Sequence, residues 1–229
     1  MIRVSHVSKS FGPVLALDDV SLDVEPGERI AFVGSNGSGK TTLLRAILGL
    51  VRVAGHVTIG GVDVARRPEI ALRRVAYIPQ IAPPIDAPVS EVVLAHAALR
   101  GIPRHATVAT AKRLGLDVEA FGATRFRDLS GGMKQKLLAA MALATGAEVL
   151  ACDEPTANLD PLSRDAFFEE IERRSTDRIV LLCSHRAEEV LKLVDRVVQM
   201  RDGRIVANEE NDSVRPPRHG ERPLLRVVT

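Results

Sequence analysis

The sequence has little of what marks a secreted or a nucleic-acid-binding protein. Only two of its 229 residues are cysteines, Cys152 and Cys183, and each lies within an apolar run. We therefore expect two buried thiols in a reducing compartment and no disulfide framework. Lys and Arg number 31 against 29 Asp and Glu, a formal net charge of +2, and no long block of one sign occurs. Because the basic surface of a nucleic-acid-binding protein is missing, we expect no nucleic-acid partner.

Long apolar segments are also missing. No apolar run approaches the roughly 20 residues that a membrane-spanning helix needs, and the first six residues are too polar for a secretory signal. We therefore expect a chain that is soluble by itself and that another polypeptide must hold if it works at a membrane. With 45% hydrophobic and 26% charged residues, the composition is that of a globular protein with a sizeable core.

The order of the expected elements indicates an α/β fold. Alternating apolar and polar residues between turns predict antiparallel strands over residues 1–30. The apolar run 29–33 is followed by a glycine-rich turn and a helical stretch at 42–50, which make half of a strand–helix–strand unit. Continuous apolar runs at 149–152 and 179–183 are typical of strands covered on both faces of a mostly parallel sheet.

A helical pattern interrupts this arrangement. From about residue 88 to 140 the sequence predicts an inserted α-helical subdomain, with Ser90 as the N-cap of its first helix. Further on, Asp202-Gly203 is typical of the turn of a hairpin. The segment 208–229 is polar, and we interpret it as a weakly ordered tail with a docking strand at 224–228.

A glycine-rich segment carries the strongest chemical signal. Residues 34–41 match the pattern of glycine, four residues, and then Gly-Lys-Ser/Thr, and they lie between a strand and a helix as phosphate binding requires. Backbone amides of such a loop surround phosphate oxygens, Lys40 can bridge the β- and γ-phosphates, and Thr41 can ligate magnesium. These features predict the core of a P-loop NTPase. The expected nucleotide-binding residues are Gly34, Ser35, Asn36, Gly37, Ser38, Gly39, Lys40, Thr41 and Thr42.

Two adjacent carboxylates follow the apolar run 149–152. The end of a strand is where α/β sheets bind ligands, and because the chain turns there both side chains can reach one site. Asp153 would then hold magnesium, and Glu154 would orient and deprotonate the attacking water. An Asp-Glu pair after a strand is common by itself, so this interpretation depends on the phosphate loop.

Further motifs resemble those of the ATP-binding-cassette (ABC) ATPases. Leu129-Ser130-Gly131-Gly132-Met133 resembles the signature motif of that family and precedes the paired carboxylates by about two dozen positions. Asn158-Leu159-Asp160 resembles its D-loop, Gln80 its Q-loop glutamine and His185 its switch histidine. Phe11 falls where the family places an aromatic ring that stacks on adenine. The resemblance implies an ABC ATPase domain at 1–207, with the helical subdomain inserted, and a tail at 208–229.

The resemblance also implies a reaction and partners. Two ATPase subunits would sandwich two ATP molecules, each with Mg²⁺ held by Thr41, Gln80 and Asp153, and Glu154, Gln80 and His185 would act in hydrolysis. Ser130, Gly131 and Gly132 open a helix whose free amides form a second anion site, which in the family faces the nucleotide of the partner subunit. Asp160 would communicate across the same interface. A transmembrane permease would hold the subunit at the cytoplasmic face of the membrane.

Single residues outside the loop have plainer alternatives. Gln80 could be a solvated loop glutamine, and His185 could be a histidine at the edge of the core. Phe11 could pack on Pro13 as a surface aromatic.

Other function classes fit less well. A GTPase would carry an Asn-Lys-x-Asp motif, which is absent, and a small-molecule kinase would have no use for the signature segment. Only 89 positions separate Lys40 from Leu129, too few for the coiled-coil arms of a DNA-repair cassette. We predict a transport ATPase, with an exporter indicated by Met133 in place of the commonest signature glutamine. An importer ATPase, or a cassette regulating a membrane complex without transport, remains the alternative. A groove beside Gln80, with Ala82, Ile85 and Val89, is the predicted docking surface for the permease.

Overall fold

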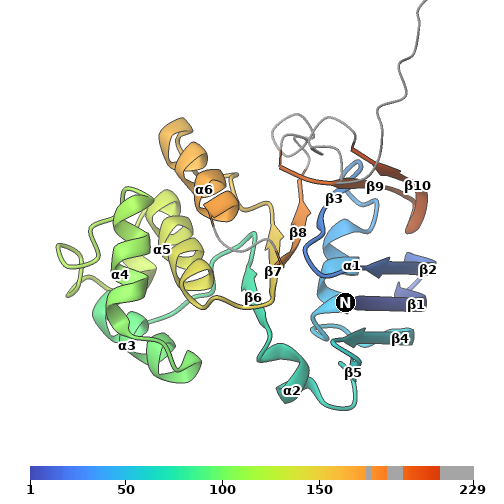
Figure 1. Cartoon of the computed structure of the whole chain (residues 1–229), viewed down its shortest axis with the longest axis horizontal. Helices are drawn as coiled ribbons and strands as arrows, with labels where there is room; N and C mark the ends of the chain where they lie inside the picture. Colours follow the sequence, from blue (N-terminus) through green and yellow to red (C-terminus); the bar gives the residue numbers. More distant parts are fainter. Residues whose placement is uncertain (174–176, 185–192, 212–229) are drawn as a thin grey trace, which may run out of the picture.

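The structure of the protein, a computed structural model, describes residues 1–173, 177–184 and 193–211 (Figure 1). His185 and the predicted docking strand at 224–228 lie outside the described residues. The strands are β1 (Ile2–Phe11), β2 (Val14–Val24), β3 (Arg29–Val33), β4 (Ala54–Ile59), β5 (Val62–Asp63), β6 (Val75–Ile78), β7 (Val149–Asp153), β8 (Ile179–Cys183), β9 (Arg196–Arg201) and β10 (Arg204–Glu210). The helices are α1 (Lys40–Ile47), α2 (Pro68–Leu72), α3 (Val89–Arg100), α4 (Arg104–Arg113), the 3₁₀ turn η1 (Phe126–Asp128), α5 (Gly131–Ala144) and α6 (Pro161–Arg173).

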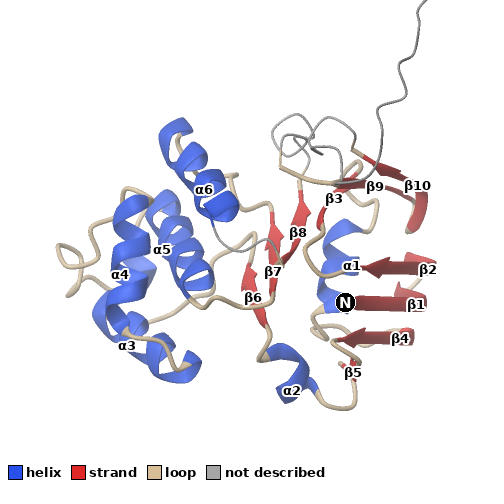
Figure 2. Ribbon diagram, in the orientation of Figure 1, coloured by secondary structure: helices blue, strands red, loops and turns tan. Residues whose placement is uncertain are grey.

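Two sheets and a group of helices form the molecule. A mostly parallel sheet has the strand order β10-β9-β3-β8-β7-β6, and an antiparallel sheet has the order β2-β1-β4-β5. Helix α1 lies between the two sheets, whereas α5 and α6 pack on the other side of the parallel sheet and α3 and α4 lie beyond α5 (Figure 2). The predicted α/β fold is confirmed, with its antiparallel β subdomain and its inserted α-helical subdomain. None of the helices in the described ranges has the length and apolar character needed to cross a bilayer.

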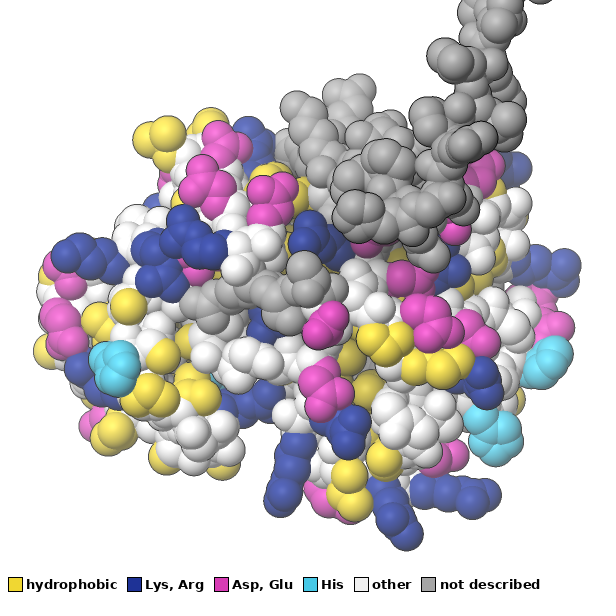
Figure 3. Space-filling model, viewed as in Figure 1, with side chains coloured by type: hydrophobic (Ala, Val, Ile, Leu, Met, Phe, Trp, Pro, Cys, Tyr) yellow, Lys and Arg dark blue, Asp and Glu magenta, His cyan; other side chains and the backbone are white. Residues whose placement is uncertain are grey.

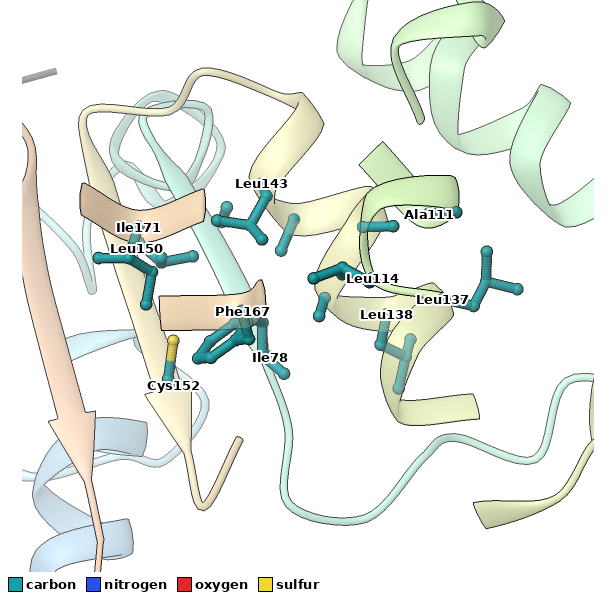
Figure 4. Close-up of a cluster of buried hydrophobic side chains, with 14 of the residues drawn as sticks. Ile78, Ala111, Leu114, Leu137, Leu138, Leu143, Leu150, Cys152, Phe167 and Ile171 are labelled. Carbon is teal, nitrogen blue, oxygen red and sulfur yellow. The ribbon is translucent and has the colours of Figure 1, made fainter. Parts of the chain in front are cut away.

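The parallel strands are covered on both faces, as their continuous apolar runs predict. In β7, Leu150 and Cys152 belong to the cluster under α5 and α6, whereas Val149 and Ala151 belong to the cluster around α1. Figure 4 shows the first of these clusters, with Phe167 of α6 beside Cys152. Cys152 and Cys183 are both buried free thiols, and burial raises the pKa of each.

The helix after the glycine-rich loop differs in its bounds from the predicted 42–50. It begins at Lys40, and it ends at Ile47 because Gly49 adopts φ +64° and turns the chain. The amide of Leu50 then donates to the carbonyl of Arg45 at 2.9 Å, which closes the C-terminal turn.

The start of the helical subdomain corrects two expectations. The N-cap of α3 is Pro88, not Ser90, and it makes no side-chain cap. The first amides of α3 donate instead to the backbone of a distant loop: Val89 to the carbonyl of Thr124 at 2.9 Å and Ser90 to that of Gly122 at 3.0 Å. Val89 is buried in the core, so its predicted role in a docking surface is wrong.

The C-terminal hairpin supports the glycine-rich loop. Strands β9 and β10 pair antiparallel through Asp202 and Gly203, both with positive φ, as the sequence predicts. The amide of Gly203 donates to the carbonyl of Ser38 at 3.1 Å. Strand β10 runs to Glu210, so residues 208–210 of the predicted tail pair with β9 and belong to the sheet. Basic and acidic side chains are mixed over the face shown in Figure 3.

Candidate active site

The last glycine of the glycine-rich loop is packed so closely that a side chain is excluded at its position. Gly39 has φ +105°, and a Cβ at this position would lie 2.7 Å from the carbonyl oxygen of Ala16 in β2. The antiparallel sheet therefore packs directly against the loop just before α1 begins. This close approach is a second reason for glycine, besides the access of phosphate to the backbone amides.

Lys40 places its charge over the same loop. The side chain is buried, with 7% exposed, and its Nζ donates to the carbonyls of Gly34 at 2.8 Å and Ser35 at 2.9 Å. These two bonds hold the ammonium group beside the loop amides, where an anionic ligand would meet both.

Asp153 faces α1 because of the alternation along β7. It lies on the same face as Val149 and Ala151, is fully buried, and accepts a hydrogen bond from Thr41 Oγ1 to Oδ1 at 2.9 Å. Its other oxygen, Oδ2, is buried without a hydrogen-bond partner among the residues described. Burial raises the pKa of Asp153, and the hydrogen bond from Thr41 with the charges of Arg45 and Lys40 partly opposes this shift.

The unpartnered oxygen fits a magnesium site. A hydroxyl and a carboxylate oxygen side by side are the kind of ligands that Mg²⁺ takes from a protein, the rest of its shell coming from phosphates and water. A nucleotide with its metal therefore fits this arrangement: the loop amides, the ammonium group of Lys40, and the pair of Thr41 and Asp153.

Glu154 reaches the site by leaving the strand. Its φ is +50°, a conformation uncommon for a residue other than glycine, and its amide donates to the carbonyl of Cys183 at 3.0 Å. This left-handed turn ends the alternation of β7, and Glu154 lines the cavity beside the glycine-rich loop. Strain of this kind is often found at functional sites.

A single cavity brings several predicted residues together. Its volume is about 540 Å³, and it is lined by Val33, Gly34, Ser35, Asn36, Gln80, Glu154 and Ser184. Ser184 was not predicted to belong to the site. The signal was its position directly after an apolar strand, and its amide donates to the carbonyl of Phe32 in the neighbouring strand at 3.4 Å.

The signature segment opens a helix, as predicted. Helix α5 begins at Gly131, and its N-cap Ser130 accepts a hydrogen bond from the amide of Met133 at 3.3 Å. A Cβ at Gly132 would lie 2.9 Å from the carbonyl oxygen of Asn158 in the same chain. A small residue is therefore required here by the fold of one chain, before any phosphate is considered.

Two other predicted residues, Asp160 and Phe11, lie apart from the cavity lining. Asp160 accepts from the amide and the hydroxyl of Ser163 at 2.9 and 2.7 Å and pairs with Lys136 at 3.0 Å, and these contacts hold its pKa well below the usual value. Phe11 is half exposed, with Lys9 Nζ 4.9 Å from the centre of its ring. Within the described ranges, neither these residues nor the signature segment lines the cavity.

Comparison with known proteins shows the family of the chain. The family model described as ABC transporter matches residues 17–157. The chain is 37% identical to the Phosphonates import ATP-binding protein PhnC of Frankia casuarinae, over 91% of this chain and 89% of the relative. It is 34% identical to the Nod factor export ATP-binding protein I of Burkholderia pseudomallei, over 90% of this chain and 69% of the relative.

Solved structures share the fold. One described as the ATP binding subunit of an ABC transporter superposes with a TM-score of 0.84 at 28% identity, covering 93% of this chain and 91% of that one. A dimeric ATP-binding cassette in a post-hydrolysis state, bound to ADP and Pi, gives 0.81 at 23% identity, covering 92% and 99%.

The fold is that of a P-loop ATPase with an inserted helical subdomain, in which the signature segment 129–133 opens helix α5. The chain belongs to the ABC transporter family, as an ATP-binding subunit with ATPase activity.

Proposed function

We propose that this chain hydrolyses ATP as one of two ATPase subunits and thereby powers a separate transmembrane permease at the cytoplasmic face of a membrane. The observation that carries the proposal is the single cavity in which the phosphate loop, Gln80 and Glu154 meet. Thr41 and Asp153, with Gln80, would hold Mg²⁺, which neutralises charge on the phosphates when bound.

Each group has a defined task in this mechanism. Lys40 and the loop amides bind the phosphates, and Gln80 orients the attacking water. Glu154 accepts the proton of that water as its oxygen attacks the γ-phosphorus and ADP leaves. The signature segment does not line the cavity of its own chain, so Ser130, Gly131 and Gly132 are free to close the cavity of a second subunit.

Two substitutions test the site. Glu154→Gln keeps the shape of the side chain and removes the base, so we expect ATP to bind with unchanged affinity while turnover falls at least about 100-fold. Lys40→Ala should abolish binding of an ATP analogue in an equilibrium titration. Near-normal phosphate release by the first variant, or unchanged affinity of the second, would contradict these roles.

The requirement for two subunits has its own test. Specific activity should rise with protein concentration and reach a plateau as dimers form, and Glu154→Gln with ATP should elute as a dimer in size-exclusion chromatography. Constant specific activity at extreme dilution by a strictly monomeric protein would refute the proposal.

Export is the direction we propose, on the basis of Met133 in the signature segment. One relative is named for import and another for export, so importer function is the alternative outcome. The permease surface that we propose lies beside Gln80, where Ile81 is 79% exposed and Ala82 and Ile85 are partly buried. Transport by the reconstituted complex in vesicles would decide direction, and hydrolysis without solute movement would favour a regulatory cassette.

A further inference from the structure

Helix α5 is attached to the segment after Glu154 at three places. Gly132 meets the carbonyl of Asn158, where a Cβ would stand 2.9 Å away. Gln135 Nε2 donates to the carbonyl of Pro155 at 3.1 Å, and Lys136 Nζ pairs with Asp160 at 3.0 Å. The first turns of α5 and residues 155–160 are therefore joined along their length within one chain.

Gln135 is the buried member of these contacts. It is 2% exposed on a helix whose other buried residues are apolar, such as Leu138 and Leu143 in Figure 4. An amide in such surroundings is unfavourable unless it is hydrogen-bonded, and a leucine or methionine would pack there without that requirement. Packing alone therefore does not explain a glutamine at this position.

The bond partner of Gln135 lies next to the base proposed above. Pro155 directly follows Glu154, whose left-handed backbone is held on its other side by the carbonyl of Cys183. The carbonyl of Glu154 also accepts from the amide of Ala157 at 3.2 Å, which makes a tight turn. Gln135 binds this turn from α5. The backbone of Glu154 is therefore held on its N-terminal side by the Cys183 carbonyl and on its C-terminal side by Gln135.

We propose that Gln135 is a positioning residue that holds Glu154 in its catalytic geometry by binding the carbonyl of Pro155. This inference rests on the proposed function of Glu154 as the base. Since Ser130 is the N-cap of the same helix, a displacement of α5 moves the turn that carries Glu154 in its own cavity. Helix α5 and Glu154 then move together.

A size-matched variant tests the proposal. Gln135→Met keeps an unbranched side chain of similar length and removes the donor, so packing is largely kept. We expect kcat to fall about 10- to 100-fold while KM for ATP changes less than about threefold, because the phosphate loop is not touched. A kcat equal to that of the unmodified protein would overturn the proposal, whatever happens to Tm.

A pH profile distinguishes a donor from a space-filling group. In Gln135→Glu, the protonated carboxyl can donate to the Pro155 carbonyl, whereas the ionised form only accepts and repels it. The activity of this variant relative to the unmodified protein should rise at least about fivefold from pH 8.5 to pH 6.0. A flat ratio over this range would overturn the proposal.

The Glu154→Gln variant separates the two hypotheses. If Glu154→Gln loses turnover and Gln135→Met keeps it, the positioning role fails and the base stands. If Glu154→Gln keeps turnover, the base fails and the positioning role fails with it. Loss of kcat in both, with acid rescue of Gln135→Glu, supports both.

Discussion

Thr41 Oγ1 donates a hydrogen bond to Asp153 Oδ1 at 2.9 Å, joining residues 112 positions apart. Strands β3, β8 and β7 are parallel neighbours, so the loop after β3 and the end of β7 open at the same edge of the sheet. The fold therefore brings the two proposed magnesium ligands, Thr41 and Asp153, together without a bound metal. Asp153 Oδ2 has no hydrogen-bond partner among the described residues.

Asp153→Asn should separate stability from activity. Burial raises the pKa of Asp153, which means that the ionised form is held at a cost. The amide keeps the hydrogen bond from Thr41 without the charge, so we expect Tm of the nucleotide-free protein to rise by a few degrees. Mg²⁺-dependent ATP hydrolysis should fall at least about 100-fold. Thermal unfolding with phosphate-release assays checks this, and a lower Tm would show that the charge stabilises the site.

Gly132→Ala should destabilise the chain without any ligand. The new Cβ would lie 2.9 Å from the backbone oxygen of Asn158, which has to move. We expect a loss of roughly 1–3 kcal/mol in the free energy of unfolding, measured by denaturant titration. Gly131→Ala is the matched control, because its Cβ would be 4.0 Å from the nearest side-chain atom of Asn158. Equal loss in both variants would mean that the contact with the Asn158 carbonyl is not responsible, since helix propensity by itself favours alanine over glycine at both positions.

The ion pair between Arg113 and Glu170 should stabilise the joint between α4 and α6. Arg113 donates to both oxygens of Glu170, at 2.5 and 3.0 Å, and Glu170 is 2% exposed. Arg113→Met removes both of these hydrogen bonds from a buried carboxylate that also pairs with Arg173 at 3.3 Å, so we expect a loss of about 2–3 kcal/mol in the free energy of unfolding, or roughly 5–10 °C in Tm. Adding Glu170→Met should restore most of the loss. A double variant no more stable than the single one would refute this account.

His96 should make stability depend on pH below neutrality. Burial, with the nearby charge of Arg100, lowers the pKa of His96, and its Nδ1 is buried without a partner among the described residues. As pH falls, His96 is protonated in the unfolded chain before it is protonated in the folded one. The contribution of neutral His96 to the free energy of unfolding is therefore fully present above pH about 6.5 and is lost as pH falls below that value.

Replacing His96 with glutamine should remove this slope. Between pH 7.5 and 5.5 the unmodified protein should lose roughly 1–3 °C more in Tm than His96→Gln. The same change at exposed His105 should leave the difference intact. Identical pH profiles for all three proteins would exclude His96 as the cause.

Much of the site could be predicted from local patterns. Two local patterns place their residues at the ligand-binding edge of the sheet: a glycine-rich loop between a strand and a helix, and two carboxylates after a buried strand. The carboxyl ends of parallel strands meet at that edge, so the two patterns are expected to lie close together. Ser90 failed as an N-cap because the amides at the start of α3 are bonded to Gly122 and Thr124, which no local pattern reveals. Ser184 was missed because its signal, a position directly after an apolar strand, is weak by itself.

The sequence by itself determined the class of the protein, since the loop, the carboxylates and the signature segment act through short-range geometry and appear in a fixed order. Only the tertiary structure decided how Glu154 reaches the cavity: its backbone is left-handed, and its amide donates to the carbonyl of Cys183, in a strand that begins 25 positions later in the chain. It also decided why Gly132 must be small and what Gln135 binds, because both depend on residues that approach α5 from a later loop. Contacts of this kind arise from packing between distant segments, and composition and periodicity do not encode them.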